Sequence, residues 1–278
     1  MSVLVLTLII LVGAYFAGLL GSLTGLGGGV VIIPLLTIGL GINIHYAIGA
    51  SLVSVIATSS GSAAAYVKEG ITNMRIGMFL EIATTTGALI GAMLSLVIHA
   101  PIIAVIFGVI LIFSAIMSLR KKDTTVLQTE SVWAEKLKLN GSYPTADGEV
   151  KYGVRKVGGG FVMMLFAGVI SGLLGIGSGS LKVVAMDSIM RIPFKVSTTT
   201  SNFMIGVTAA ASAVVYLQRG YIDPALAMPV VIGVLLGALT GSKILVKSTS
   251  SGWLRWVFAV IVTILAGQMI YNGLTGKI

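Results

Sequence analysis

Residues 24–34 read TGLGGGVVIIP and residues 174–180 read LGIGSGS, and these two glycine-rich stretches decide how the chain folds. The first has four glycines within Gly25–Gly29 and an apolar run closed by Pro34. In the second, Gly175, Gly177 and Gly179 alternate with other residues. Glycine inside a helix costs about 1 kcal/mol relative to alanine. Each stretch is therefore expected to interrupt a helix, at places 150 residues apart (175 − 25 = 150).

The rest of the chain is strongly apolar. Its 278 residues are 56% hydrophobic and 10% charged, with a mean hydropathy of +1.05, whereas soluble domains are about 25% charged. Several stretches approach or exceed the roughly 18–20 apolar residues that cross a bilayer. The clearest are Ser2–Leu20, His45–Tyr66, Gly77–Ile98, Pro101–Leu119, Val196–Leu217, Ala225–Val246 and Trp253–Tyr271. We expect an all-α polytopic protein of the cell membrane, with the lipid bilayer as its surroundings.

Charge and cysteine content exclude several classes of function. The net charge of +9 raises the possibility of nucleic-acid binding, but the basic residues lie in short segments beside the expected spans. That placement is typical of membrane topology, in which basic residues stay on the cytoplasmic side, so no nucleic-acid partner is expected. The chain has no cysteine, which excludes disulfides, thiolate metal sites and cysteine nucleophiles.

The spacing of 150 residues holds along much of the chain, which indicates a duplicated unit. We expect a first transmembrane repeat over residues 1–119 and a second over residues 159–278. Between them, the polar connector 120–158 is expected to be cytoplasmic and to contain a β-hairpin, because LKLNGSY and EVKYGVR alternate apolar with polar residues around PTADG. Matching pairs include Gly18 and Gly168, Ser51 and Ser201, Tyr66 and Tyr216, and Gly87 and Gly237.

Each repeat is expected to hold a glycine-broken helix or a re-entrant hairpin followed by three transmembrane helices. The distribution of basic residues favours opposite insertion of the two repeats, as in transporters built from inverted repeats. Two short crossings and a re-entrant hairpin remain alternatives at this point.

The broken helices suggest a binding site for an anion. Irregular backbone inside a bilayer is tolerated only where protein buries it or where it lines a watery cavity. A helix that restarts there presents free N–H groups and about half a positive charge, and glycine lets a ligand approach closely. The alternative is that the glycines only permit close helix packing, which is our interpretation of Gly87–Gly91 and Gly237–Gly241.

Polar residues near the two breaks complete the candidate site. Lys182 lies in the apolar run LKVVAM, where a cation is an expected contact for the anion; snorkelling and pairing with Asp187 are the alternatives. Glu81 is a candidate carrier of a coupling proton, or a structural partner of Lys182, of Arg75 or of a helix end. The candidate binding residues are Gly25, Gly27, Gly28, Gly29, Ser51, Gly175, Gly177, Ser178, Gly179, Lys182, Ser201 and Asn202.

The motifs TGLGGGVVIIPLL, GLLGIGSGSLKVV, TTTSNFMIGVTAAASAVVY and RGYIDP resemble the TauE/SafE family of sulfite exporters and organosulfonate permeases, over essentially the whole chain. The resemblance implies membrane transport of a small sulfur-containing anion such as sulfite or sulfoacetate. Two positions depart from the family pattern: Ser178 replaces a glycine, and Val184 stands where a proline is common. Ser178 would then add a hydroxyl donor to the ligand.

These observations predict a secondary transporter that binds its anion near the bilayer midplane and works by alternating access. An anion channel that uses the same helix ends is the alternative. We expect neither an enzyme, because Ser178 has no evident histidine or aspartate partner, nor a cofactor or metal site. The expected partners are a small anion and a coupling proton, and a homo-oligomer remains open.

Overall fold

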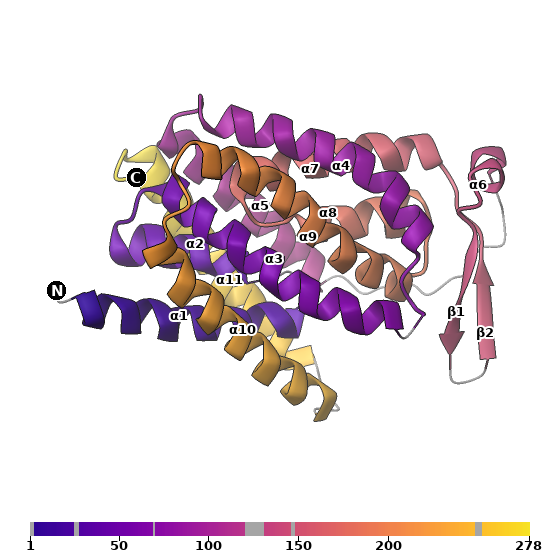
Figure 1. The fold of residues 1–278 in the computed structure, drawn as a ribbon, viewed down its shortest axis with the longest axis horizontal. Coiled ribbons are helices and arrows are strands. Elements are labelled where there is room, and N and C mark those ends of the chain that lie inside the picture. Colours follow the sequence, from indigo (N-terminus) through magenta and orange to yellow (C-terminus); the bar gives the residue numbers. More distant parts are fainter. Residues whose placement is uncertain (1–2, 25–27, 69, 120–130, 146–147, 248–251) are drawn as a thin grey trace.

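The computed structural model describes residues 3–24, 28–68, 70–119, 131–145, 148–247 and 252–278, and these form a helical bundle with one small hairpin (Figure 1). The first half of the chain contains α1 (Val3–Thr24), α2 (Gly29–Pro34), the π-helix η1 (Leu35–Gly39), α3 (Ile44–Lys68), α4 (Met74–Ser95) and α5 (Ala100–Leu119). The second half contains α7 (Val157–Leu174), α8 (Gly179–Val184), the π-helix η2 (Ala185–Ile189), α9 (Phe194–Gln218), α10 (Pro224–Lys247) and α11 (Gly252–Leu274).

The length and exposure of these helices confirm the expected all-α membrane class. Four stretches among the described residues are long and apolar enough to cross a bilayer: Met74–Ser95, Ala100–Met117, Val157–Leu174 and Phe194–Gln218. Large apolar side chains cover the outside of the bundle, among them Leu4, Ile82 and Phe166, each more than half exposed. Such a surface is unfavourable in water and is typical of contact with lipid.

The two halves have the same order of elements at a constant spacing. α2 and α8 begin 150 residues apart (179 − 29 = 150). The same spacing separates the starts of the two π-helices, of α3 and α9, and of α4 and α10. The spacing found in the sequence therefore recurs in the positions of the helices. Opposite insertion of the halves in a bilayer stays a prediction.

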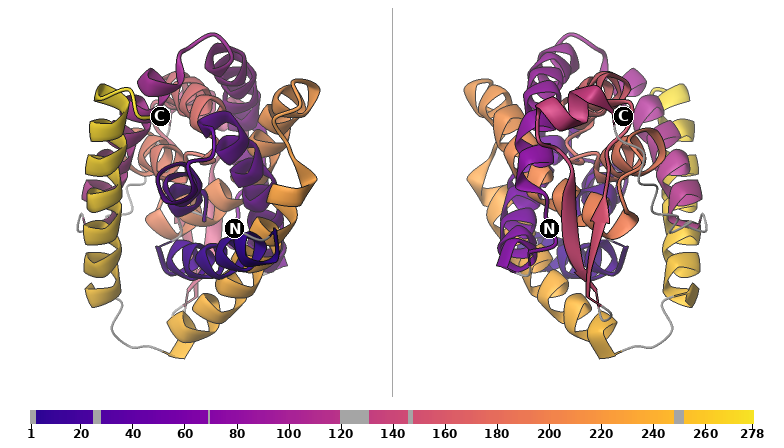
Figure 2. Two further views of the ribbon diagram at one scale, coloured as in Figure 1. Left: turned by 90° about the vertical axis from the view of Figure 1, so that its left-hand side faces the viewer. Right: turned by 90° about the vertical axis from the view of Figure 1, so that its right-hand side faces the viewer.

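Helices of one half pack mainly on helices of the other. α1 packs on α10 and α4 on α7, while α3 packs on α9 and α5 on α11. In Figure 1, α1 lies beside α10 and α4 beside α7 at opposite edges of the bundle, and Figure 2 shows α11 beside α5 on one flank. Exchanging the two halves leaves this set of contacts unchanged, as an approximate two-fold axis requires.

Glycines make the closest of these contacts possible. A Cβ atom added to Gly87 or Gly91 of α4 would clash with the backbone of Leu165 or Val169 in α7, and one added to Gly237 of α10 would clash with Tyr15 in α1. Small residues four apart let two helix backbones approach in a membrane. The packing interpretation of Gly87, Gly91 and Gly237 is thus confirmed, while the side chain position of Gly241 lies outside the described residues.

Both predicted helix breaks are present. α7 ends at Leu174, and Gly175, Gly177 and Ser178 then adopt the left-handed backbone conformation, with φ of 66°, 70° and 41°. In the first half, α1 ends at Thr24 and α2 begins at Gly29. Each short helix continues into its π-helix, giving 11 residues, which at the rise of an α-helix span about 16 Å, or about half the thickness of a bilayer's hydrocarbon core.

Both π-helices directly follow a short α-helix. Pro34 is the last residue of α2 and lies inside the continuous helical stretch, and η1 follows it directly. In the second half Val184 occupies the matching place, and η2 follows it in the same way. A π-helix at this position therefore does not require a proline.

The connector carries a short helix, α6 (Val132–Lys136), and a hairpin of β1 (Gly141–Thr145) and β2 (Gly148–Tyr152), which pair antiparallel with Gly141 opposite Tyr152. Asn73 caps α4 by accepting a hydrogen bond from the Ile76 N–H, and its Nδ2 donates to the Tyr152 hydroxyl at 2.8 Å. Burial raises the pKa of Tyr152, and the hydrogen bond from Asn73 opposes that shift. The hairpin is thus fixed to the bundle at the start of α4.

Candidate functional site

The two helix breaks meet inside the protein. The Ser51 hydroxyl in α3 donates a hydrogen bond to the carbonyl of Gly175, which belongs to the other half, at 2.8 Å. Gly29, the first residue of α2, lies against both: an added Cβ would be 2.5 Å from Ser51 Oγ and 3.4 Å from the Gly175 carbonyl oxygen. A side chain at position 29 would therefore displace the Ser51 hydroxyl, which makes the hydrogen bond between the halves, whereas the Gly175 carbonyl oxygen lies at ordinary contact distance.

The predicted hydroxyl groups hold the broken backbone in place. Ser178 is buried and donates to the Ala167 carbonyl at 2.6 Å, and Ser201 donates to the Gly179 carbonyl at 3.3 Å. Together with Ser51, all three predicted serines use their protons on main-chain acceptors. Of the three acceptors, Gly175 lies in the interruption itself, where its buried carbonyl needs a donor, whereas Ala167 lies within α7 and Gly179 begins α8.

Backbone donors accompany these hydroxyls. At the start of α8, the Lys182 N–H donates to the carbonyl of Ser178, the N-cap residue, at 3.1 Å. In α2 the amides of Val31 and Ile32 both bond to the Gly28 carbonyl. The N–H groups before these residues sit at helix starts, where the helix dipole favours negative charge.

Lys182 is fully buried, so it does not snorkel to a surface. Its Nζ donates to the Thr208 hydroxyl in α9 at 2.6 Å, and that hydroxyl lies 2.6 Å from Oε1 of Glu81 in α4 and 2.8 Å from the Met204 carbonyl. A threonine thus bridges a buried cation and a buried carboxylate. The sequence left Lys182, Arg75 and a helix end as alternative structural partners of Glu81, and the structure links Glu81 to Lys182 through Thr208.

The environment of Glu81 is incomplete in one respect. Thr85 donates to the same Oε1 at 3.0 Å, while Oε2 is buried and has no hydrogen-bond partner among the described residues. A buried acceptor without a donor is costly, and more so when it carries charge. This oxygen is therefore the least satisfied polar atom of the cluster.

The remaining predicted residues lie as follows. Gly28 is the buried N-cap of α2, and Gly177 packs against Ile205 and Val55. Asn202 is half-buried on α9, next to Ser201. Gly25 and Gly27 lie outside the described residues.

Sequence reasoning missed Thr208. The signal available was its position in the apolar run IGVTAAA and its match to Thr58 at the 150-residue spacing. It also missed Tyr216, which is fully buried and donates from its hydroxyl to Ser95 Oγ at 2.6 Å. That bond joins α9 to α4 but involves no residue of the candidate site.

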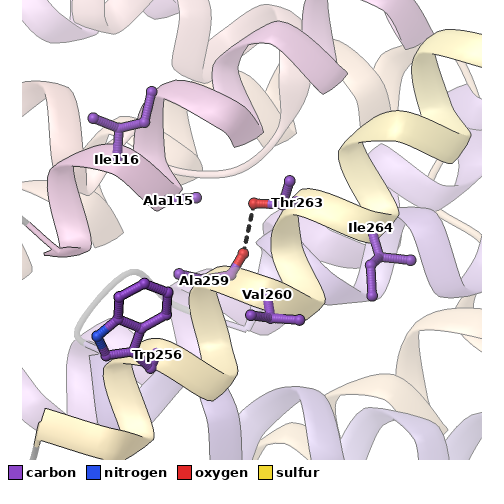
Figure 3. Close-up of a pocket in the computed structure, with 7 residues that line it drawn as sticks. All are labelled: Ala115, Ile116, Trp256, Ala259, Val260, Thr263 and Ile264. Carbon is purple, nitrogen blue, oxygen red and sulfur yellow. Dashed lines mark hydrogen bonds between the residues drawn. The ribbon is translucent and has the colours of Figure 1, made fainter.

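A second feature, a shallow hollow of about 260 Å³ between α5 and α11, does not suit an anion (Figure 3). Its one hydroxyl, that of Thr263, donates to the Ala259 carbonyl at 2.7 Å, as the dashed line in Figure 3 shows. No charged group faces it among its lining residues, which are Ala115, Ile116, Trp256, Ala259, Val260, Thr263 and Ile264. The buried contact between the helix breaks is therefore the candidate site.

Comparison with known proteins adds independent information. The chain is 28% identical to "Probable membrane transporter protein YunE" of Bacillus subtilis over 273 residues, covering 96% of this chain and 98% of that protein. It is 29% identical to "Probable membrane transporter protein YdhB" of the same organism, covering 85% and 89% of the two chains. It is 25% identical to "Probable membrane transporter protein MJ0441" of Methanocaldococcus jannaschii, covering 87% and 86%. No solved structure is significantly similar to this chain.

A family model described as "Sulfite exporter TauE/SafE" matches residues 9–269. That range begins within α1 and ends within α11, so it includes both helix breaks, the connector and the Lys182–Thr208–Glu81 cluster. The motif resemblance and the relatives' names agree with it. The chain therefore belongs to the sulfite exporter TauE/SafE family.

Proposed function

We propose that the protein is a secondary transporter of a small sulfur-containing anion, either sulfite or an organosulfonate such as sulfoacetate, and that it works by alternating access. The observation that carries this proposal is the meeting of the two helix breaks, where Ser51 of one half bonds to Gly175 of the other. A ligand bound at such a contact touches both halves, so movement of one half against the other changes its access to the two sides of the membrane.

The chemistry near the contact suits an oxyanion. Helix starts provide N–H donors and partial positive charge, Lys182 provides a full charge, and the hydroxyls of Ser51 and Ser178 provide further protons. In the described conformation these hydroxyls donate to backbone carbonyls. A sulfite or sulfonate group has three oxygen acceptors. It would take the Ser51 proton when the halves separate, because that bond crosses between them, and would compete with the Ala167 carbonyl for the Ser178 proton. The family name refers to a sulfite exporter, which agrees with an anion as the substrate, and the relatives' names refer to membrane transporters.

We further propose that the protein lies in the plasma membrane with the connector on the cytoplasmic side. The basic residues support this orientation, because short cytoplasmic segments are enriched in lysine and arginine. Described examples in or beside the connector are Lys136, Lys138, Lys151, Arg155 and Lys156.

Flux measurements in proteoliposomes test the proposal. The purified protein should take up radiolabelled sulfite or sulfoacetate in a saturable manner that depends on an imposed gradient. Lys182→Met should abolish uptake, because it removes the buried charge, whereas Lys195→Met should retain it, because Lys195 is exposed at the start of α9. Electrodiffusive flux without saturation would identify a channel instead, and equal uptake by the two variants would remove Lys182 from the site.

A further inference from the structure

Because the two halves match, the positions of Lys182, Thr208 and Glu81 have counterparts at the 150-residue spacing, and the counterparts carry no charge. At the 150-residue spacing the matching residues are Ile32, Thr58 and Val231. Ile32 is fully buried, as Lys182 is, and Val231 is half-buried. The fold therefore accepts an apolar version of this arrangement. Since a buried ion pair is weak evidence for stability, the charged version requires an explanation other than folding.

Few other ionisable groups lie on the elements around the pair. One is Asp187 on η2, which follows α8 and contacts α7 and α9; it is half-buried and has an interaction of its own. On α4 itself, Arg75 lies near the helix start, six residues before Glu81. α7, which packs on α4, has no ionisable side chain between Val157 and Leu174. α9, which also packs on α4, has Lys195 near its start and Tyr216 near its end, and Tyr216 bonds to Ser95. Within the described residues, Lys182 is the one charged group that a hydrogen-bonded link joins to Glu81.

One carboxylate oxygen of Glu81, Oε2, is free to accept a proton. Its Oε1 accepts from Thr85 and lies within bonding distance of the Thr208 hydroxyl, but its Oε2 is buried without a partner. Protonation of Oε2 would convert this orphan acceptor into a neutral hydroxyl. It would also free Lys182 from its negative partner, because the Thr208 hydroxyl can then donate to the Met204 carbonyl alone.

We propose that Glu81 takes up a proton when an anion binds to Lys182, so that proton and anion cross the membrane together. The inference rests on the proposed function and adds the coupling ion and its direction. Before binding, the Lys182 ammonium and the Glu81 carboxylate sum to zero charge. A proton from solvent bonds to Oε2 and the ammonium turns to the incoming anion. The sum is again zero for a monoanion, and for a dianion such as sulfoacetate it is −1, where it would be −2 without the proton. A site of low dielectric favours such neutrality.

The direction of coupling follows from this exchange. The anion and the carboxylate compete for one cation, so the anion binds better when Glu81 is protonated, and reciprocally the bound anion favours protonation. Proton and anion then move in the same direction, and an inward proton gradient drives uptake rather than export. Thr208 is a positioning residue in this scheme, since its hydroxyl connects the two charged groups.

Isothermal titration calorimetry on the purified protein tests the exchange. Sulfoacetate is the probe, because its charge stays constant between about pH 6 and about pH 8. Titrations in buffers of different ionisation enthalpy give the number of protons taken up on binding. The wild-type protein should take up about one proton per anion, and wherever it does so its affinity for the anion should fall about tenfold per pH unit. Glu81→Gln should bind sulfoacetate with no proton uptake and no such pH dependence.

Control variants distinguish the loss of the Glu81 charge from a general effect of substitution on the protein. Glu135→Gln, on the exposed face of α6, should keep the proton uptake of the wild type. Thr208→Ser should keep it as well, whereas Thr208→Val should bind the anion with a shallower pH dependence, because the carboxylate no longer restrains Lys182.

Three outcomes are distinct. Binding with proton uptake that Glu81→Gln removes supports the inference. Wild-type binding without proton uptake overturns it while leaving the proposed transporter intact, and this result needs no variant to fold. Absence of binding for both sulfoacetate and sulfite overturns the proposed anion site itself, and the inference with it.

Discussion

Replacing Gly91 by alanine should separate α4 from α7 and destabilise the protein. An added Cβ would clash with the Val169 carbonyl oxygen and would lie 2.8 Å from the Val169 carbonyl carbon and 2.9 Å from the Leu173 nitrogen. Ordinary van der Waals contact begins at 3.4 Å, so the carbonyl carbon alone requires α7 to retreat by 0.6 Å (3.4 − 2.8 = 0.6), and the nearer carbonyl oxygen requires more. The obstructing atoms belong to the backbone and cannot rotate away, unlike the end of a side chain.

The magnitude follows from two opposing effects. Overpacking costs about 1–3 kcal/mol, and the upper part of that range applies when backbone must move. Alanine in place of glycine inside a helix gains about 1 kcal/mol. The net free energy of unfolding should therefore fall by about 2 kcal/mol, which lowers the melting temperature by about 4–8 °C in a chain of this size.

Gly267→Ala is the matched control. Gly267 lies within α11, is exposed, and has no atom within 4 Å of an added Cβ. The same methyl group should raise the free energy of unfolding by about 1 kcal/mol there. Thermal unfolding of both variants in detergent, followed by tryptophan fluorescence, measures the difference of about 3 kcal/mol between them. A Gly91→Ala protein that melts at or above the wild-type temperature would refute the close-packing argument.

Three further outcomes are expected. Ser51→Ala should lower the free energy of unfolding by about 1–3 kcal/mol and slow anion uptake, because the buried Gly175 carbonyl loses its donor; unchanged melting and flux would contradict this. The raised pKa of Tyr152 means that the folded state holds the phenol proton more tightly than the unfolded state does, so the free energy of unfolding should fall as pH rises above about 10. In melting curves recorded over a series of pH values, Tyr152→Phe should abolish that part of the fall. Ser142→Cys introduces the single cysteine of the chain and should react with a membrane-impermeant maleimide in inverted vesicles but not in intact cells; labelling of intact cells would place the connector outside.

Sequence reasoning predicted the features that depend on one residue or on a spacing. Gly175 and Gly177 adopt positive φ, which residues with a Cβ rarely do, so a glycine cluster predicts a break directly. Lys182 is conspicuous because a charge in an apolar run is rare. The spacing of 150 residues gave the arrangement of helices in two matching sets.

The features that were not predictable depend on how distant elements meet. Glu81 and Thr208 come from α4 and α9, so nothing local in the sequence indicates that a hydroxyl joins them to Lys182. The serine hydroxyls had several acceptors available, and only the fold decides that Ser178 donates to Ala167. The π-helices have no common residue before them, since Pro34 precedes one and Val184 the other.

The hairpin has a practical consequence for imaging. A protein of 28.7 kDa that is almost wholly immersed in a detergent micelle offers few features for aligning particle images. The Tyr152 end of the hairpin bonds to Asn73 of the first half, and the Arg155 amide just beyond it bonds to the Met190 carbonyl of the second half at 2.9 Å. An antibody fragment raised against the strands would thus be tethered firmly to both halves. It would serve as a fiducial mark for electron cryomicroscopy and, by restraining both halves at once, would favour one arrangement of the two halves.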